Sequence, residues 1–249
     1  MSEAKVRNTV EFVVYGRNAL FSDVLTRSGG EKCTYPIPTY ESLKGITSSI
    51  YWKPTIVWII DAVRVINPIR TERKGIRPII PSGGNDLAYY TYLYDVCYQV
   101  RAHFVRNENR PELENDYIED KHFIIANKMI KRGGRRDIFL GTRECQGYVE
   151  PCVFGEGKGA YDNSGTMAFG MMYHGITYAD EAILDEDKGL MTTRFWNPQM
   201  VDGVIKFIRP EECTVKRHIR AMPIKRFSRE DNNFIGLEEF EGGELIELD

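Results

Sequence analysis

The sequence DKHFIIANKMIKRGGRRDIFLG, residues 120–141, holds a helix, a turn and a strand in one short segment. Apolar residues recur there at helical spacing and predict a helix over residues 119–132. Gly133 ends this helix, because glycine readily adopts the backbone conformation that follows a helix C-terminus. Residues 138–140 are a strand candidate directly after the turn. The segment therefore predicts a domain that mixes helices with strands.

Four further elements precede this segment. Residues 10–15 alternate in the period-two pattern of a strand. Pro38 and Thr39 open a helix, with Thr39 as its N-cap, and Lys53-Pro54 ends it. Residues 55–66, rich in Val, Ile and Trp, predict a buried strand, and a tyrosine-rich strand runs from residue 90 towards 104. Its tyrosines are expected to cover a sheet face, with one or two left exposed for binding.

With strand candidates at 138–140 and 148–153, the order is β-α-β-β-α-β. This order predicts an α+β fold of the ferredoxin-like, or RNA-recognition-motif-like, type. From residue 155 onward, glycines separate short runs with little helical periodicity, which predicts an appended antiparallel β-sheet subdomain. The expected divisions are a first domain over 1–155, a β-rich subdomain over 156–229 and an acidic tail over 230–249.

The charge of the chain is distributed unevenly. The net charge is −3, yet residues 230–249 hold eight acidic residues and no basic one. The rest of the chain contains 28 of the 36 acidic residues and all 33 basic residues, so its net charge is +5. A polyanionic partner is therefore compatible with the composition, because local patches decide such binding.

The five cysteines include no Cys-x-x-Cys pair, so the sequence favours neither a disulfide framework nor a structural zinc site. They are typical of reduced thiols in the cytoplasm. The most apolar stretch, 56–66, is interrupted by Asp61 and Arg64 and is too short to span a bilayer. We expect a soluble cytoplasmic protein without a metal, a cofactor or a membrane partner.

Lys121 and His122 open the predicted second helix, where backbone N–H groups are free and the helix dipole is positive. Cleavage of RNA without a metal uses the 2′-hydroxyl of the substrate as nucleophile, so the protein must move protons and balance charge. His122 suits proton transfer because an imidazole titrates near neutral pH, and a helix N-terminus favours its neutral form. Lys121 can supply a compact positive charge to a phosphate. The alternative for this pair is a solvated helix end.

A basic turn, residues 131–136, follows the helix. Its residues are Lys131, Arg132, Gly133, Gly134, Arg135 and Arg136, and Lys128 lies one helical turn earlier. The two glycines would let backbone amides approach an anion, and the basic side chains exceed what a helix C-cap needs. We expect these seven residues to contact RNA phosphates; the alternative is a basic cap followed by a surface turn.

The remaining polar groups carry weaker signals. The only Asp-x-Asp sequence, residues 185–187, has no histidine nearby and is expected to be a solvated acidic turn rather than a two-metal nuclease site. His103 alternates with strand residues and is expected to be structural. His218 stands beside Lys216, Arg217 and Arg220, which predicts a second basic patch.

Several motifs resemble those of a known family. They are GGEK at 29–32, PTY at 38–40, LKGI at 43–46, IYWKPT at 50–55, GGRRDIFLG at 133–141 and RECQGY at 143–148. Together they resemble the CRISPR-associated fifth Cas family of the RAMP superfamily, in the subtype of type I-C interference complexes. The resemblance covers residues 8–215 and is absent from the acidic tail.

The resemblance implies an endoribonuclease that cuts precursor CRISPR RNA within each repeat and then stays on the 5′ handle. The expected reaction needs no metal and leaves a 2′,3′-cyclic phosphate and a 5′-hydroxyl. The implied catalytic residues are Tyr51, Lys121 and His122. The implied partners are crRNA and other Cas subunits of the type I-C complex, with double-stranded DNA as a further candidate.

Tyr51 lies one helical turn from Ser48 and seven residues from Lys44, which predicts a polar face at the end of the first helix. A phenol with a pKa near 10 is a poor base at neutral pH, so Tyr51 is expected to orient the 2′-hydroxyl or the phosphate. The alternative is an aromatic plug beside Trp52. Two other functions stay open: a non-catalytic scaffold that caps crRNA, and a metal-dependent DNA nuclease.

Overall fold

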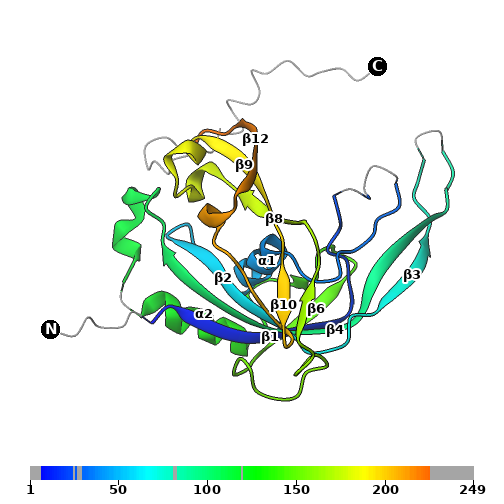
Figure 1. The fold of residues 1–249 in the computed structure, drawn as a ribbon. Helices are drawn as coiled ribbons and strands as arrows, with labels where there is room; N and C mark the ends of the chain where they lie inside the picture. The colour runs from blue at the N-terminus through cyan, green and yellow to red at the C-terminus, as the bar shows by residue number, and fades with distance from the viewer. Residues whose placement is uncertain (1–6, 25, 27–29, 81–82, 119, 225–249) are drawn as a thin grey trace.

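A computed structural model describes residues 7–24, 26, 30–80, 83–118 and 120–224 (Figure 1). The acidic tail that the sequence predicts, 230–249, lies outside the described residues. None of the helices in the described ranges is long and apolar enough to cross a membrane.

Two α-helices and twelve strands make up the described part of the fold. In chain order they are β1 (Thr9–Ala19), α1 (Tyr40–Ile50), β2 (Ile56–Val65), β3 (Thr71–Ile76), β4 (Ala88–Arg106), α2 (Lys121–Lys131), β5 (Ile138–Phe139), β6 (Gln146–Pro151), β7 (Thr166–Ala168), β8 (Met172–Thr177), β9 (Leu190–Trp196), β10 (Gln199–Val201), β11 (Val204–Lys206) and β12 (Val215–Ala221). Short 3₁₀ turns occupy η2 (Pro111–Asp116), η3 (Ala179–Glu181), η4 (Asp185–Asp187) and η5 (Pro210–Glu212). The fold is a mixed α and β structure.

The main sheet contains nine strands, all paired antiparallel. Its order is β5-β6-β1-β4-β2-β11-β10-β7, and β3 pairs with β4 beside this path. Helix α1 packs against β2, and α2 packs against β1 and β6. The side chains of Phe12, Trp58 and Phe104, one from each of the three long central strands, are at most 3% exposed and form part of the core.

Local sequence explains where α1 begins and ends. The hydroxyl of Thr39 accepts a hydrogen bond from the Ser42 amide at 3.1 Å, which confirms Thr39 as the N-cap. Tyr40, Leu43 and Ile50 are buried along one face of the helix. The helix ends at Ile50, because the next residue, Tyr51, has an extended backbone, and Pro54 follows three residues later.

Helix α2 confirms the predicted helix, with a shorter N-terminal end. It begins after Asp120, a non-glycine residue with a φ of 56° and no side-chain capping hydrogen bond. It ends at Lys131. The amide of Gly134 donates a hydrogen bond to the Met129 carbonyl at 2.8 Å, as is common at helix C-termini. Its buried face is formed by His122, Ala126 and Ile130. A catalytic candidate is therefore part of the packed side of this helix.

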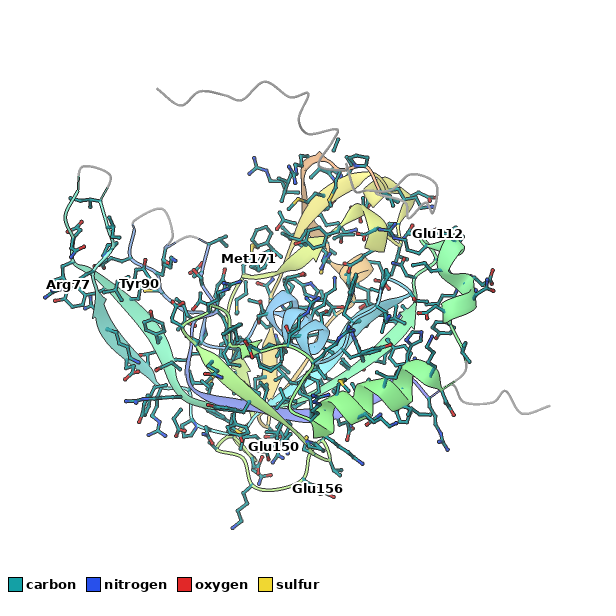
Figure 2. All side chains as sticks on the ribbon, turned by 180° about the vertical axis from the view of Figure 1, so that it is seen from behind. Arg77, Tyr90, Glu112, Glu150, Glu156 and Met171 are labelled. Carbon is teal, nitrogen blue, oxygen red and sulfur yellow. The ribbon has the colours of Figure 1, made fainter. Side chains whose placement is uncertain are left out.

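Strand β4 is longer than the tyrosine-rich strand that the sequence predicts. Its first half pairs with β3, a strand that no pattern in the sequence indicates. The resulting two-stranded arm, marked by Arg77 and Tyr90, projects away from the helices (Figure 2). Tyr92 and Tyr98 are buried, and Tyr89 and Tyr94 are exposed. The expectation that one or two of the tyrosines stay exposed is confirmed, whereas only two of the five, Tyr92 and Tyr98, are buried in the sheet.

The C-terminal part of the chain builds more than an appended sheet. Strands β8, β9 and β12 form a separate three-stranded antiparallel sheet. Strands β7, β10 and β11 instead extend the main sheet, because β11 pairs with β2 through Ile205 opposite Val63. The expectation of a purely appended sheet after residue 155 is wrong for these three strands. Main-chain pairing joins them to the core, a long-range contact that hydrophobic periodicity does not predict.

Candidate active site

Tyr51 and His122 meet at the boundary between the two helices. Tyr51 is the first residue after α1, and His122 lies in the first turn of α2, 71 residues later in the chain. The Tyr51 Oη lies 2.8 Å from the His122 Nδ1. Their exposed fractions are 2% and 1%. The expectation that Tyr51 lies on a polar helix face is therefore wrong: it is enclosed, and its hydroxyl is satisfied by an imidazole.

The other ring nitrogen of His122 determines the direction of this hydrogen bond. His122 Nε2 lies 3.1 Å from the backbone carbonyl oxygen of Asp116. A carbonyl oxygen can only accept, so Nε2 carries the proton in the neutral ring. Nδ1 then bears the lone pair and accepts from the hydroxyl of Tyr51. The Tyr51 oxygen keeps its own lone pairs for another donor.

Lys121 belongs to the same cluster through Asp116. Its Nζ lies 2.5 Å from the Asp116 Oδ1, and the hydroxyl of Thr55 donates to the Asp116 Oδ2 at 2.6 Å. The side chains of Lys121 and Asp116 are each 32% exposed, whereas Thr55 is buried. Lys121 is therefore the member of the predicted trio that reaches solvent. In the view of Figure 2, α2 lies across the sheet. The label Glu112 marks the η2 turn, which precedes α2 in the chain.

Burial sets the protonation of the site. It lowers the pKa of His122 below 6.5, helped by the nearby cations of Lys121 and Lys53, while Asp116 acts in the opposite direction. Burial and the Asp116 carboxylate raise the pKa of Tyr51 to about 12, while Arg135 opposes this rise. Near neutral pH the cluster thus holds a neutral imidazole and a protonated phenol. The neutral form of His122 was predicted from the helix N-terminus, but its main cause is burial.

The basic turn packs against the end of α1. The amides of Arg135 and Arg136 donate to the carbonyls of Ile50 and Ser49 at 3.1 and 3.0 Å. The amides of Gly133 and Gly134 donate to carbonyls of α2 at 3.0 and 2.8 Å. These four N–H groups are committed within the protein, so the expectation that they cradle an anion is wrong. The turn instead brings Arg135 beside Tyr51.

The side chains of the basic turn remain available. Lys128, Lys131, Arg132, Arg135 and Arg136 are all exposed. Among the ion pairs of the described residues, none involves any of these five cations. They form a group of positive charges without ion-pair partners among the described residues, and Arg135 lies near enough to Tyr51 to affect its pKa.

Asp116 and Thr55 are the members of the site that sequence reasoning missed. Asp116 lies in the acidic sequence PELEND, which is typical of a solvated segment. Its distinguishing sequence feature is its position five residues before Lys121, and Thr55 directly precedes a strand. Neither feature is specific enough to identify a site without the tertiary contacts.

Other candidate residues lie apart from this cluster. His103 pairs with Asp61 at 2.8 Å, in agreement with a structural role. In the described ranges no group of three or more His, Cys, Asp or Glu residues could hold a metal ion. Asp187 is only 3% exposed and lies 3.6 Å from Lys216, so the acidic turn at 185–187 is not fully solvated as expected. Lys216 also pairs with Glu186, which reduces the predicted second basic patch.

Comparison with known proteins connects this geometry to a family. The family model described as CRISPR-associated protein (Cas5), in its Cas5d branch, matches residues 9–208. A curated protein from Thermus thermophilus, named CRISPR pre-crRNA endoribonuclease Cas5d, is 28% identical over 148 residues. That alignment covers 55% of this chain and 62% of the relative, so it spans less than two thirds of the relative's length.

Two crystal structures resemble the chain over most of its length. One is a CRISPR-associated protein with 33% identity and a TM-score of 0.71, aligned over 84% of this chain and 96% of the other. The second is a functionally uncharacterized protein from Streptococcus mutans with 35% identity, a TM-score of 0.68 and the same two coverages.

Proposed function

The chain belongs to the CRISPR-associated Cas5 family, in its Cas5d branch, and from this we propose that it is an endoribonuclease that cuts precursor CRISPR RNA. The observation that carries the proposal is the contact of Tyr51 with His122 at 2.8 Å, next to Lys121. These three residues come from two separate helix ends, and they bring a proton acceptor, a hydroxyl and a cation together.

The proposed fold is ferredoxin-like, of the RAMP type. Its support is the strand order β6-β1-β4-β2, in which α1 connects β1 to β2 and α2 lies between β4 and β6. Residues 1–155 would then be the core domain and 156–229 an extension that adds strands to it, followed by the tail at 230–249. The proposed setting is the cytoplasm, with crRNA and other Cas subunits as partners.

The proposed reaction is attack of the 2′-hydroxyl on the adjacent phosphate. The 2′-oxygen gives its proton to the Tyr51 oxygen while Tyr51 gives its own proton to the His122 Nδ1. Tyr51 acts as a relay because a phenol with a pKa of about 12 does not hold a negative charge near neutral pH. The new P–O2′ bond and the broken P–O5′ bond leave a 2′,3′-cyclic phosphate and a 5′-hydroxyl.

Lys121 completes the proposed chemistry. Its ammonium group, in the partly exposed pair with Asp116, can balance the charge of the phosphorane and give a proton to the leaving 5′-oxygen. Exposed side chains of the basic turn, together with Lys128, would hold the RNA phosphates. No step of this route uses a metal ion.

The test is cleavage of repeat RNA in EDTA, followed by analysis of the product ends. The proposal expects cutting in EDTA, a cyclic phosphate on the 5′ fragment, and no cutting when the scissile nucleotide carries a 2′-deoxy sugar. Loss of cleavage in EDTA, or cleavage of the 2′-deoxy substrate, would contradict the mechanism.

One observation favours a second candidate, a non-catalytic subunit that caps crRNA. His122 is 1% exposed and both of its ring nitrogens are engaged, as in many structural histidines. Under this alternative, Lys121→Ala and His122→Ala would leave RNA processing unchanged while the basic turn still bound RNA. Assaying the two variants separates the candidates.

A further inference from the structure

We propose that Asp116 is a positioning residue for this reaction, which fixes the orientation of His122 with its backbone and the location of the Lys121 ammonium with its side chain. The inference rests on the proposed endoribonuclease function. Asp116 does not itself need to touch the reacting atoms. Asp116 connects His122 and Lys121 to Thr55, a buried residue directly before β2.

The backbone of Asp116 determines which nitrogen of His122 is basic. Its carbonyl oxygen accepts from Nε2 at 3.1 Å and leaves Nδ1 as the acceptor towards Tyr51. If the ring were to adopt the other tautomer, two lone pairs would face each other at Nε2 and the Tyr51 hydroxyl would lose its acceptor. The η2 turn therefore selects the tautomer that the relay requires.

The carboxylate of Asp116 determines where Lys121 lies. Oδ1 accepts from the Lys121 Nζ at 2.5 Å, and Oδ2 accepts from the Thr55 hydroxyl at 2.6 Å. Thr55 is 3% exposed, so the carboxylate is fixed from its buried side. These hydrogen bonds also hold the pKa of Asp116 below its ordinary value, which keeps it charged.

The ion pair between Lys121 and Asp116 can be exchanged for a pair with RNA. Both side chains are 32% exposed, and partly exposed ion pairs contribute little net stability because water competes for the charges. An incoming phosphate can therefore share the ammonium. The Asp116 carboxylate repels that phosphate at the same time, so it opposes RNA binding while it aligns Lys121.

Asp116 also influences the titration of His122. The titratable and charged groups that face His122 are Asp116 of η2, Lys121 of α2, Lys53 before β2, and the hydroxyls of Tyr51 and Tyr117. Asp116 is the anion among them. Removal of its charge leaves burial and two cations opposed only by the backbone hydrogen bond to residue 116, so the pKa of His122 falls further.

The decisive experiment is single-turnover cleavage of repeat RNA by the full-length chain, comparing wild type with Asp116→Asn across pH and RNA concentration. We expect a rate about tenfold lower at saturating RNA, a smaller loss than for a group that touches the substrate. RNA binding should be tighter, and the acid limb of the pH profile should move to lower pH. A residue with a merely structural role would not combine slower cutting with tighter binding.

Asp137→Asn is the matched control, since Asp137 is an exposed acid near the basic turn, outside the Asp116 cluster. Equal cleavage rates and equal acid limbs for Asp116→Asn and Asp137→Asn would overturn the inference. Thr55→Val provides a second variant, which keeps the charge of Asp116 and removes its anchor. It should slow cutting without moving the acid limb.

If Asp116→Asn does not fold, as judged by circular dichroism, Thr55→Val decides: a wild-type rate for it overturns the inference. The failure of the proposed function has a different signature. Wild-type chain that does not cut repeat RNA, or a His122→Ala variant that cuts it normally, removes the function and the inference together. Normal wild-type cutting with an unaffected Asp116→Asn removes only the inference.

Discussion

The Tyr51–His122 pair and the basic turn both adjoin the end of α1, yet they differ in almost every physical property. Tyr51 and His122 are enclosed, and their polar atoms are matched by partners inside the protein. The cations of the basic turn are exposed and form no ion pairs among the described residues. The backbone of the turn, in contrast, is hydrogen-bonded to both helices.

This difference separates two tasks. Proton transfer depends on short, fixed distances and on a neutral imidazole, and burial supplies both. Attraction of a polyanion depends on charges that water and salt can reach, and it varies with ionic strength. A hydrogen-bonded turn that carries exposed cations brings the two tasks within reach of one substrate. The comparison predicts that substitutions in the two regions affect different measurements.

The largest effect is expected in the buried pair. Tyr51→Phe and His122→Ala should each lower the single-turnover cleavage rate by about 10²–10³-fold, because each removes a group from the proton relay. RNA affinity should stay close to that of wild type. Rate and affinity are measured with the same repeat RNA. His218→Ala, at a more exposed histidine on β12 that contacts Thr192, is the control that should cut normally.

A smaller effect on a different quantity is expected in the basic turn. Arg132→Ala together with Arg136→Ala should weaken RNA binding at all sequences and reduce the slope of log affinity against log salt by about one per lost phosphate contact. Cutting at saturating RNA should be largely retained. Arg209→Ala, at an arginine near Glu211, is the matched control. An unchanged salt slope in the double variant would contradict the assignment of the turn.

A backbone change tests whether the turn must be rigid. Gly134 has a φ of 110°, and an added Cβ would lie 3.0 Å from the Arg136 carbonyl oxygen. Gly134→Ala should lower the free energy of unfolding by about 1–3 kcal/mol and weaken RNA binding several-fold. Thermal unfolding and binding assays measure both. Gly45→Ala, in open space within α1, should not weaken binding.

The smallest effect concerns pH. The folded-state pKa of His122 lies below 6.5, so the imidazole is neutral above that lower value. The cleavage rate should rise with pH, and the midpoint of this rise should lie below the ordinary pKa of an imidazole. Lys53→Met removes a cation that lowers the pKa, so the acid limb should move to higher pH. A midpoint at or above the ordinary imidazole pKa in the wild type would contradict the role of His122 as the buried proton acceptor.

Local patterns were sufficient for much of the fold. Thr39 as an N-cap, Gly133 as the end of α2 and the buried strand β2 all follow from short-range preferences of backbone and side chain. Strand β3 was not predicted, because its charged residues and glycine do not form the alternating pattern of a strand. The pairing of β11 with β2 joins residues far apart in sequence, and no local pattern encodes such a contact.

The sequence by itself determined the family, the helix ends and the identity of Tyr51, Lys121 and His122 as candidates. Only the tertiary structure decided that Tyr51 donates to a buried His122, that Asp116 contacts both His122 and Lys121, and that the amides of the basic turn bond to carbonyls of α1 and α2 instead of an anion. The physical reason is that hydrogen-bond direction, burial and pKa depend on which groups lie next to one another in the folded protein. Tyr51 and His122 are 71 residues apart in the chain, and they come into contact only when both helices pack on the sheet.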